Sequence, residues 1–260
     1  SPIFVKAETA TGKEAPPDRA VARPLITSCI ANVTTNIRNT VHIYGNTGGL
    51  WDAKLEQLDP TMMRVLVYSS YSGRLLAQSF ISATDYDENG NKVFKGNLGI
   101  SQGDYNMVIY NFDTPTTQVS SESSVDQIIA YTDEISSAQK AKLLNLSTKA
   151  DDDYFENIAI HYEPEHLLVA NEKNLRISPH DTLVTIETEA NTIIDSYYLQ
   201  IRVEGMQYAS EATAVISGLS PSNKIGLNER TIDPSAAVYF GLEKGDSVWI
   251  ASDVKQLLYT

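Results

Sequence analysis

Hydrophobic and polar residues alternate over short stretches of this chain, and turn residues separate the stretches. Met63–Tyr68 is a strongly apolar run, Arg74–Ser82 continues after it, and small polar residues fill Ser69–Gly73 between them. Such runs, bounded by turn residues, are typical of strands, so the two stretches predict an antiparallel hairpin. A second hairpin is predicted where Asp87-Glu88-Asn89-Gly90 precedes a strand at Val93–Leu98, because Asn-Gly tolerates the positive φ angles of tight turns.

Further strands are predicted on both sides of these hairpins. Leu25–Asn36 and Asn39–Tyr44 precede them, and the long apolar run Tyr105–Phe112 follows, with a pattern typical of a strand buried on both faces. The clearest alternation is Tyr197–Glu204, in which every second residue is apolar. The second half adds predicted strands at 158–161, 166–170, 183–188, 212–216, 236–242 and 248–251. This density of strands predicts an all-β fold.

One region departs from the strand pattern. Between Ser120 and Ala150 the apolar residues follow helical spacing, which predicts one or two short bridging helices; these residues are Val125, Ile128, Ile129, Ile135, Ala138, Ala141, Leu143 and Leu144. The acidic run Asp151-Asp152-Asp153 follows and is typical of a solvated loop, so we place a domain boundary there. The predicted organisation is a flexible tail over 1–23, a β-sandwich domain with a helical linker over 24–150, and a second β-sandwich domain over 151–260.

Composition and charge exclude several classes of function. The formal net charge is −13, and no stretch gathers Lys and Arg among aromatic residues, which argues against a nucleic-acid partner. No apolar run approaches the ~20 residues that a transmembrane helix needs. Cys29 is the single cysteine, so the sequence has no disulfide framework and no thiolate metal cluster. The tail before Ala22 is linker-like, as expected of a stalk left after removal of an export signal.

Two motifs resemble functional loops but fit turns better. Gly99-Ile100-Ser101-Gln102-Gly103 matches the G-x-S-x-G nucleophile elbow, yet a strand instead of a helix follows it. Ser101 is therefore predicted to be a turn residue. Asp85–Gly90 opens like a calcium-binding loop, but its twelfth position is Gly96 instead of the bidentate Glu, which favours a hairpin tip.

One cluster holds residue types that bind metals, namely His161, Glu163, Glu165 and His166. Pro164 interrupts it and argues against a regular ladder that would hold these side chains on one face. We find no phosphate-binding loop, dinucleotide fingerprint or catalytic triad spacing. The sequence therefore predicts a protein that is not an enzyme, with no catalytic, cofactor-binding or metal-binding residues and no cofactor.

Several stretches combine a hydrophobic strand with a characteristic turn. They are Met63–Tyr68 with Ser72-Gly73-Arg74-Leu75, Gly103-Asp104-Tyr105 leading into Val108-Ile109-Tyr110-Asn111, and Ile216-Ser217-Gly218-Leu219. Over roughly residues 24–250 the chain resembles the fimbrillin-like lipoproteins of Bacteroidetes, which are relatives of the FimA-type pilins. The resemblance implies two transthyretin-like β-sandwiches in tandem, export as a lipoprotein, and exposure at the cell outer membrane.

The resemblance also implies a route of assembly. In true pilins of this type, an Arg-specific protease removes an N-terminal segment and subunits then exchange strands, which satisfies open backbone groups of a sandwich groove. The implied processing sites are Arg19 and Arg38, whereas Arg23 precedes a proline that disfavours cleavage. No lipobox cysteine or final donor strand lies in the sequence, so membrane contact is expected only through an anchor outside it. The apolar stretch Gln256–Tyr259 has no terminating turn, and the natural chain is expected to continue past Thr260.

The sequence thus predicts a surface-exposed fimbrial or adhesin-type structural subunit. Its expected partners are other fimbrial subunits or copies of itself, and beyond them host protein or glycan. The alternative is an outer-membrane, lipid-anchored binding module for glycan or protein that does not polymerise. Aromatic residues in predicted loops could contact such a ligand, although packing is the commoner role of each; they are Trp51, Tyr71, Tyr86 and Tyr208.

Overall fold

The computed structural model describes residues 29–38, 40–45, 50–54, 59–111, 114–144, 159–162, 164–202, 214–217, 222–229, 239–242 and 254–259. Within these residues the chain forms 17 β-strands and one α-helix, α1 (Ser137–Leu144). The predicted all-β class is confirmed, with one short helix in the region where one or two were expected. No helix in this part of the chain is long and apolar enough to cross a bilayer. The predicted tail, 1–23, lies outside the described residues.

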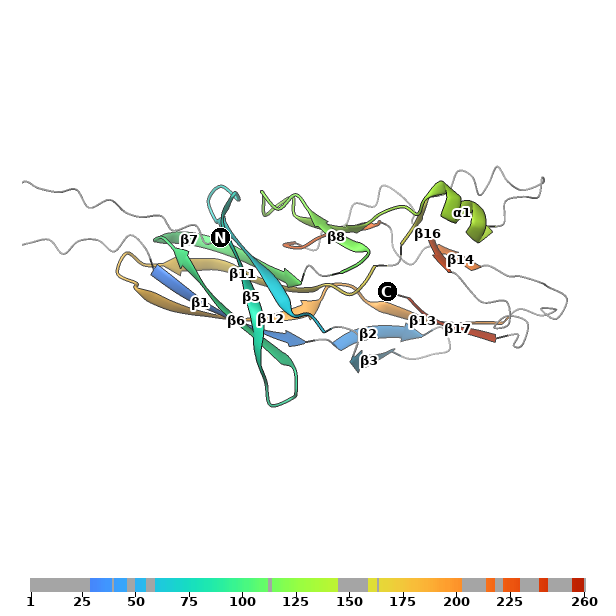
Figure 1. Cartoon of the computed structure of the whole chain (residues 1–260), viewed down its shortest axis with the longest axis horizontal. Helices are drawn as coiled ribbons and strands as arrows, with labels where there is room; N and C mark the ends of the chain where they lie inside the picture. Colours follow the sequence, from blue (N-terminus) through green and yellow to red (C-terminus); the bar gives the residue numbers. More distant parts are fainter. Residues whose placement is uncertain are drawn as a thin grey trace, which may run out of the picture.

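The largest sheet has seven strands in the order β1-β12-β11-β7-β4-β5-β6, and it closes because β6 pairs with β1. Its strands are β1 (Cys29–Arg38), β4 (Met62–Ser69), β5 (Leu75–Tyr86), β6 (Lys92–Ile100), β7 (Gly103–Asn111), β11 (Leu168–Ile177) and β12 (Leu183–Thr192). Both predicted hairpins are present, as β4–β5 and β5–β6. Figure 1 shows these strands gathered to the left of β2, β3 and β13.

Strands from both sides of residue 151 build this closed sheet. β12 runs parallel to β1 over nine residue pairs, from Ile30 opposite Leu183 to Arg38 opposite Asn191. β11 pairs antiparallel with β7. The sequence prediction misplaced these two strands, because they complete the sheet that β1 and β7 begin instead of opening a second sandwich. Alternation indicates that a strand is half buried, but it does not indicate which strand lies beside it.

The closed sheet folds into two layers, which are hydrogen-bonded to each other only at two corners. β5 pairs with β6 only over Ser82–Tyr86, and β11 pairs with β12 at only two positions. Elsewhere the strands form two layers, β5-β4-β7-β11 and β12-β1-β6, which face each other across the core. Both corners lie near the end of β1, because Lys95 of β6 is opposite Thr34 and Asn191 of β12 is opposite Arg38. The layers separate at the other end, where β1, β7 and β12 begin, and we call this the open end (Figure 1).

The core between the two layers is made by every second residue of the strands. Its fully buried members include Ala31 and Val33 of β1, Met63, Val65 and Val67 of β4, Met107 and Ile109 of β7, and Phe94 of β6. The intervening residues of β4 and β7 are also buried, in a second cluster that includes Leu66, Tyr68, Val108 and Tyr110. β4 and β7 are therefore covered on both faces, which explains why their sequences are apolar throughout.

A three-stranded sheet, β15-β9-β8, packs against the outer face of β4 and β7. It consists of β8 (Thr117–Ser120), β9 (Ile129–Thr132) and β15 (Lys224–Gly226). The helical prediction is wrong here, because Val125 and Ile128 lie in the β8–β9 connection and pack onto the closed sheet. A single helical turn, in which the Ile128 N–H donates to the Ser124 carbonyl at 3.0 Å, produces the helix-like spacing.

Two further sheets lie beyond the closed sheet. A four-stranded sheet has the order β17-β13-β2-β3, and a three-stranded sheet has the order β10-β16-β14. Their strands are β2 (Thr40–Gly45), β3 (Leu50–Lys54), β10 (Ile160–His161), β13 (Ser196–Arg202), β14 (Ala214–Ser217), β16 (Tyr239–Leu242) and β17 (Val254–Tyr259). The predicted strand at 248–251 lies outside the described residues.

One parallel pair of strands links the closed sheet to the four-stranded sheet. β2 follows β1, β13 follows β12, and partners are 153 residues apart in both ladders, as in Thr35 beside Thr188 and Ile43 beside Ser196. At the junction, the Thr192 hydroxyl donates to the Thr40 carbonyl at 3.2 Å. We call this pair, β1–β2 alongside β12–β13, the parallel ribbon.

Candidate functional site

Several large apolar side chains are exposed near the open end, on the outer faces of both layers. Ile30 and Leu183 are paired across β1 and β12 and are 53% and 58% exposed, and Leu76 at the start of β5 is 54% exposed. Tyr71, in the β4–β5 turn, is 100% exposed. Ile30 and Leu183 therefore form one apolar pair on the outer face of the β12-β1-β6 layer, and Leu76 faces outward from the other layer. Exposed apolar side chains of this size commonly mark a binding surface.

The β4–β5 turn holds Tyr71 in a firmly bonded backbone. The Ser69 N–H donates to the Arg74 carbonyl at 2.9 Å, and the Gly73 N–H donates to the Ser69 carbonyl at 2.8 Å. The Ser69 hydroxyl accepts from the Tyr71 and Ser72 amides at 3.3 and 3.1 Å. Gly73 has φ +69°, which favours glycine and closes the turn. Tyr71 therefore projects into solvent from a rigid support, which is how aromatic anchors are presented in binding proteins.

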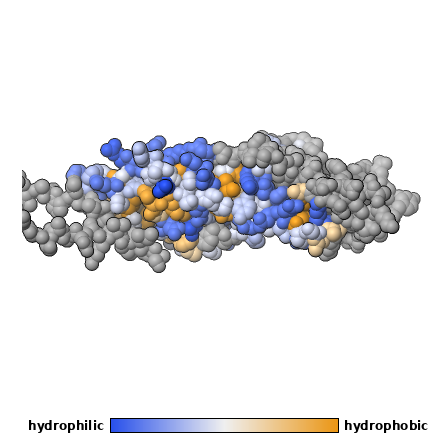
Figure 2. Space-filling model, turned by 90° about the horizontal axis from the view of Figure 1, so that it is seen from above, coloured by the Kyte–Doolittle hydropathy of each residue, from blue (hydrophilic) through white to orange (hydrophobic). Residues whose placement is uncertain are grey.

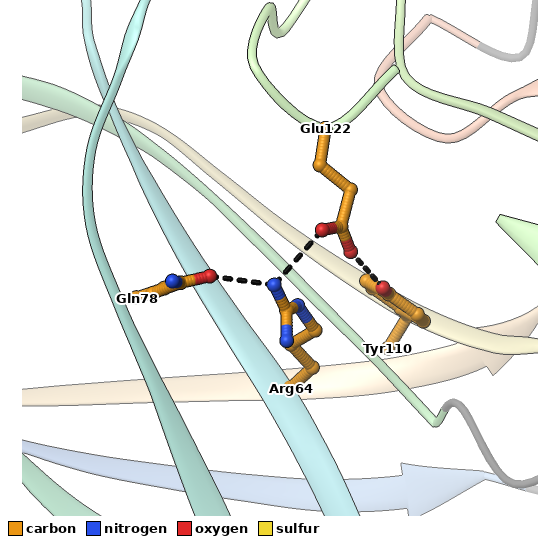
Figure 3. A network of polar contacts seen from close by, with 4 residues as sticks. All are labelled: Arg64, Gln78, Tyr110 and Glu122. Atoms are coloured by element: carbon orange, nitrogen blue, oxygen red, sulfur yellow. Dashed lines mark hydrogen bonds and ion pairs between the residues drawn. The ribbon is translucent and has the colours of Figure 1, made fainter. Parts of the chain in front are cut away.

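A polar network lies beside this surface, on the outer face of β4, β5 and β7 (Figure 3). One Arg64 nitrogen, Nη2, contacts the Glu122 carboxylate at 2.9 Å and the Gln78 amide oxygen at 2.5 Å. The Tyr110 hydroxyl donates to the other oxygen of Glu122. The Arg64 guanidinium also lies 5.4 Å from the centroid of the Phe80 ring. The network ties three strands of the closed sheet to the β8–β9 connection.

Burial makes this network a structural one. Burial first, and then the hydrogen bond to the Glu122 carboxylate, raise the pKa of Tyr110 above its ordinary value. Burial likewise raises the pKa of Tyr68, so both phenols stay protonated at neutral pH. The Tyr68 hydroxyl and Arg64 Nε are buried and form no hydrogen bond in the described part of the chain. A protonated phenol held by a carboxylate stabilises the fold but supplies no proton-transfer group near neutral pH.

Ser101 is a turn residue, as the sequence predicts. It lies between β6 and β7, and the Tyr105 hydroxyl donates to the carbonyls of Ser101 and Gln102 at 2.8 and 3.3 Å. Gly103, with φ +151°, lets the chain reverse there. Tyr105 therefore fastens the turn to the open end.

The acidic loop at Asp85–Gly90 is a hairpin tip, as predicted. The Asp87 carboxylate accepts from the amides of Asn89 and Asn91 at 2.9 and 2.8 Å, and Gly90 has φ +77°. Asp85 accepts from the Tyr86 amide at 2.9 Å. These carboxylates are engaged by the backbone of their own turn, which is typical of Asx turns.

The cluster around His161 separates into three structural roles. Nδ1 of His161 lies 3.2 Å from the Thr132 carbonyl, and Glu165 accepts from the Thr116 and Thr117 amides at 2.9 and 2.6 Å. Burial alone would raise the pKa of Glu165, but these hydrogen bonds outweigh it and lower the pKa. His166 is 5% exposed, and burial lowers its pKa to about 4. No group of three or more metal-ligand side chains occurs in the part of the chain described, and Glu163 lies outside it.

The predicted processing site Arg38 is the last residue of β1, whereas the sequence analysis placed it between two strands. Its side chain is 67% exposed, and Nη1 lies 3.9 Å from Oε1 of Glu189. Arg19 lies outside the described residues. The single cysteine, Cys29, is buried, and burial followed by the charge of Asp181 raises the pKa of its thiol, so it is a core residue.

Sequence reasoning placed the aromatic residues in loops but did not find the open end. Tyr86, at the β5–β6 tip, is 65% exposed. Trp51 belongs to β3, and Tyr208 lies outside the described residues. Ile30 and Leu183 are 153 residues apart, so only the register of β1 with β12 shows that they form one surface. Only Leu76 could have been found from the local sequence. It directly follows Leu75, and alternation along a strand places only one of two consecutive residues on the inward face.

The model of one protein family, described as a domain of unknown function (DUF5119), matches residues 51–241. The chain belongs to the DUF5119 family. A curated relative, "Putative fimbrium anchoring subunit Fim4B" of Bacteroides ovatus, is 23% identical to this DUF5119 chain over 197 residues, which is 76% of the chain and 51% of the relative. The chain therefore spans about half the length of that curated relative.

Solved structures also resemble this DUF5119 chain. A crystal structure of "a putative adhesin" from Bacteroides ovatus is 21% identical, with a TM-score of 0.54, and the match covers 85% of the chain and 65% of that structure. The fimbrial anchor protein Mfa2 from Porphyromonas gingivalis is 11% identical, with a TM-score of 0.48, and the match covers 89% and 72%. The resemblance to fimbrial proteins of Bacteroidetes is confirmed.

Proposed function

We propose that this DUF5119 chain is a cell-surface structural subunit of a fimbrium, of the anchoring or adhesin type. The similarity to a protein named as a fimbrium anchoring subunit, over 76% of the chain, carries this proposal. A fold shared with a named adhesin supports it, since fold likeness raises the expectation of function without fixing it. The exposed apolar open end supports it as well, because a structural subunit needs a surface for a neighbour.

The proposal includes location and partners. The protein would lie at the cell outer membrane, exposed to the outside and held there by a lipid anchor. Its partners would be other fimbrial subunits, which is what the name of the curated relative implies for that relative. We keep a second domain in the proposal, but only for the strands after β12. The strands β11 and β12 also follow residue 151, yet they belong to the closed sheet.

Deleting the gene in the bacterium that encodes this protein tests the proposal directly. For an anchoring subunit, we expect fimbriae of normal composition to appear in the culture medium while the cell surface loses them. Electron microscopy of the cells and immunoblots of the medium measure both quantities. A plasmid copy of the wild-type gene serves as the control and should restore surface fimbriae. Unchanged surface fimbriae in the deletion strain would contradict the proposal.

Assembly by strand exchange is the finer part of the proposal. β1 lies between β6 and β12 and makes backbone pairs with both. Loss of β1 would therefore uncover two strand edges and the apolar core between the layers, a groove that a neighbour's strand could fill. Cleavage at Arg38 would separate β1 from the rest of the chain, whereas cleavage at Arg19 would leave it in place.

Limited digestion with an Arg-specific protease distinguishes these two routes. We expect cleavage at Arg19 to precede cleavage at Arg38, because Arg38 is in β1 opposite Asn191 and a protease needs an unpaired extended segment. N-terminal sequencing of the product and size-exclusion chromatography measure the site and the assembly state. The variant Arg19→Lys is the matched control and should stay unprocessed at that position. A trimmed product that remains monomeric would argue against self-assembly.

A lipid-anchored binding module that does not polymerise is the second candidate. The observation that favours it is Tyr71, which is 100% exposed on a firmly bonded turn instead of packing into the core. An exposed aromatic on a rigid support suits contact with a glycan ring or a protein pocket. A monomeric trimmed product, combined with normal surface fimbriae in the deletion strain, would favour this candidate.

A further inference from the structure

The outer face of the β12-β1-β6 layer is exposed to solvent. Alternate residues of these three strands are buried in the core, and the intervening residues point outward, are partly or fully exposed and belong to neither core cluster. The outward residues are Ile30, Asn32, Thr34, Asn36 and Arg38 of β1, Leu183, Thr185, Glu187 and Glu189 of β12, and Lys95, Asn97 and Gly99 of β6. We call this surface the three-strand face.

The three-strand face belongs to the lower layer in Figure 1, where β1, β6 and β12 lie below β7 and β11. Figure 2 shows the protein from above, where hydrophobic residues lie in small groups between hydrophilic ones. No broad apolar surface is visible there among the coloured residues. Contact with a partner therefore has to depend on shape and charge as well as on apolar area.

One row of the three-strand face combines a large side chain with an empty position. Ile30 of β1 lies between Leu183 of β12 and Gly99 of β6. Leu183 is 58% exposed, so most of its side chain projects from the sheet. At Gly99 a Cβ atom would meet nothing within 4 Å. The row therefore has a projection on one side of Ile30 and space on the other.

A second row combines charges of opposite sign. Thr34 of β1 lies between Glu187 of β12 and Lys95 of β6, and the described residues include no ion pair between these two charges. The other two charges on the face, Arg38 and Glu189, are 3.9 Å apart and contact each other. The face therefore has no net charge, in a chain whose formal net charge is −13. Two such faces can meet without bringing an excess of like charges together.

A two-fold axis parallel to β1 matches these rows with each other. Rotation about this axis keeps each position along the strands and exchanges the two sides of β1, so that β12 of one copy lies over β6 of the other. Leu183 then lies over Gly99 of the second copy, and Glu187 lies over Lys95, each twice. A two-fold axis across the strands would instead bring Leu183 over Glu189. Only the first axis matches size with space and each charge with its opposite.

We propose that two copies of this chain associate through the three-strand face, about a two-fold axis parallel to β1. Their strands would run nearly parallel across the contact, as in packed β-sandwich sheets. No strand leaves its own sheet, because β1 stays paired with β6 and β12 in both copies. The inference deepens the proposed function by naming a second copy as a partner, and it rests on that function only for where the pair forms.

Charge reversal tests the contact between Glu187 and Lys95 of two copies. Three strands and four rows cover only about 14 Å by about 20 Å, so sedimentation velocity of the full chain should show a reversible dimer with a Kd of about 10–100 μM. Glu187→Lys and Lys95→Glu each place two pairs of like charges in the contact. Each variant alone should therefore dimerise about ten-fold more weakly or worse.

An equimolar mixture of these two variants provides the rescue. In a mixed pair, Lys at position 187 meets Glu at position 95, and Lys95 meets Glu187, so opposite charges face each other at both places. The mixture should dimerise at least as well as the wild type. A mixture that associates no better than either variant alone would overturn the proposal, and so would wild-type dimerisation of both single variants.

Two leucines of similar exposure provide a matched pair of variants. Leu183 is 58% exposed on the three-strand face, and Leu76 is 54% exposed on the outer face of the other layer. Leu183→Thr removes apolar contact at two places in the dimer and should weaken dimerisation about ten-fold. Leu76→Thr should dimerise like the wild type. Equal dimerisation by these two variants would overturn the proposal.

Gly99→Val separates the contact from the stability of the chain. Nothing in the chain lies within 4 Å of an added Cβ atom at Gly99, and β-branched residues favour strands, so the urea midpoint of dilute protein should not fall. Dimerisation should weaken about ten-fold or more, because the valine occupies the place of Leu183 of the second copy. Dimerisation of Gly99→Val at the wild-type level would overturn the proposal.

Other occupants of the face give different results in the same measurements. A wild-type chain that stays monomeric at about 300 μM would overturn the assignment of the face to a second copy. Association that appears only after cleavage at Arg19 or Arg38, and that none of these variants changes, would indicate strand exchange and overturn it as well. The deletion experiment measures fimbriae on cells and is unaffected by either result, so the two proposals fail separately.

Discussion

Acidification from pH 7 to pH 5 should lower the free energy of unfolding by about 2 kcal/mol through His166 alone, and by about 3 kcal/mol at pH 4. Burial lowers the pKa of His166 from its ordinary value of 6.5 to about 4 in the folded protein. Between these values the unfolded chain binds a proton that the folded chain does not. The stability that depends on a neutral His166 is therefore complete above pH 6.5 and falls as the pH falls toward 4.

Urea unfolding at several pH values, followed by circular dichroism, measures this dependence. His166→Gln removes the titrating ring, so its unfolding free energy should change much less between pH 7 and pH 5, whatever its value at pH 7. His180→Gln is the matched control, because His180 is exposed in the β11–β12 turn, and it should keep the wild-type slope. A wild-type slope in His166→Gln would contradict the assignment.

The neighbouring Glu165 acts over a different range of pH. Its hydrogen bonds from Thr116 and Thr117 lower its pKa below the ordinary value of 4.5. The stability that it contributes is present above that value and is lost as the pH falls through the lower, folded pKa. Measurements between pH 7 and pH 5 therefore report His166 with little contribution from Glu165.

Phe94→Ala should destabilise the protein by about 3–5 kcal/mol, the range for removing a large buried aromatic side chain. Phe94 is 0% exposed and is paired with Thr35 of β1 on one side and with Ala83 of β5 on the other. It fills the core at the corner where the two layers join. Its removal would leave a cavity that the paired strands around it cannot close, because their register fixes the backbone.

Phe80 provides the matched control for this measurement. It is the same residue type, it lies three residues before Ala83 on β5, and it is 45% exposed on the outer face. Phe80→Ala loses only partial burial and the contact with Arg64, so its cost should be about 1 kcal/mol. Urea unfolding at pH 7 compares the two variants. Similar costs for both would mean that Phe94 does not occupy the core between the two layers.

Local pattern was sufficient to predict the hairpins of the closed sheet. Asn89-Gly90 and the turn at Gly73 both specify positive φ, and the strands beside them alternate or are apolar throughout. The β8–β9 region was mispredicted because one helical turn between Ser124 and Ile128 gives two apolar side chains the same direction as a longer helix would. Spacing over so few residues does not separate the two structures.

Long-range pairing accounts for the rest of what the sequence did not predict. The parallel pairing of β1 with β12 joins residues 153 apart, and it decides both the membership of the closed sheet and the exposure of Ile30 beside Leu183. No local signal encodes such a register. The roles of Glu165 and His166 depend in the same way on contacts with Thr116 and with Ile194, which lie elsewhere in the chain.

The parallel ribbon also determines how the protein would carry a mechanical load. β1–β2 and β12–β13 keep one register through both sheets, so a pull on the start of β1 against the end of β13 acts along the strands. Such a pull shears the ladder hydrogen bonds together, whereas a pull across the strands breaks them one after another. Rupture under shear requires many bonds to fail at once. The ribbon would therefore transmit tension along the long axis of the molecule without either sheet having to unfold first.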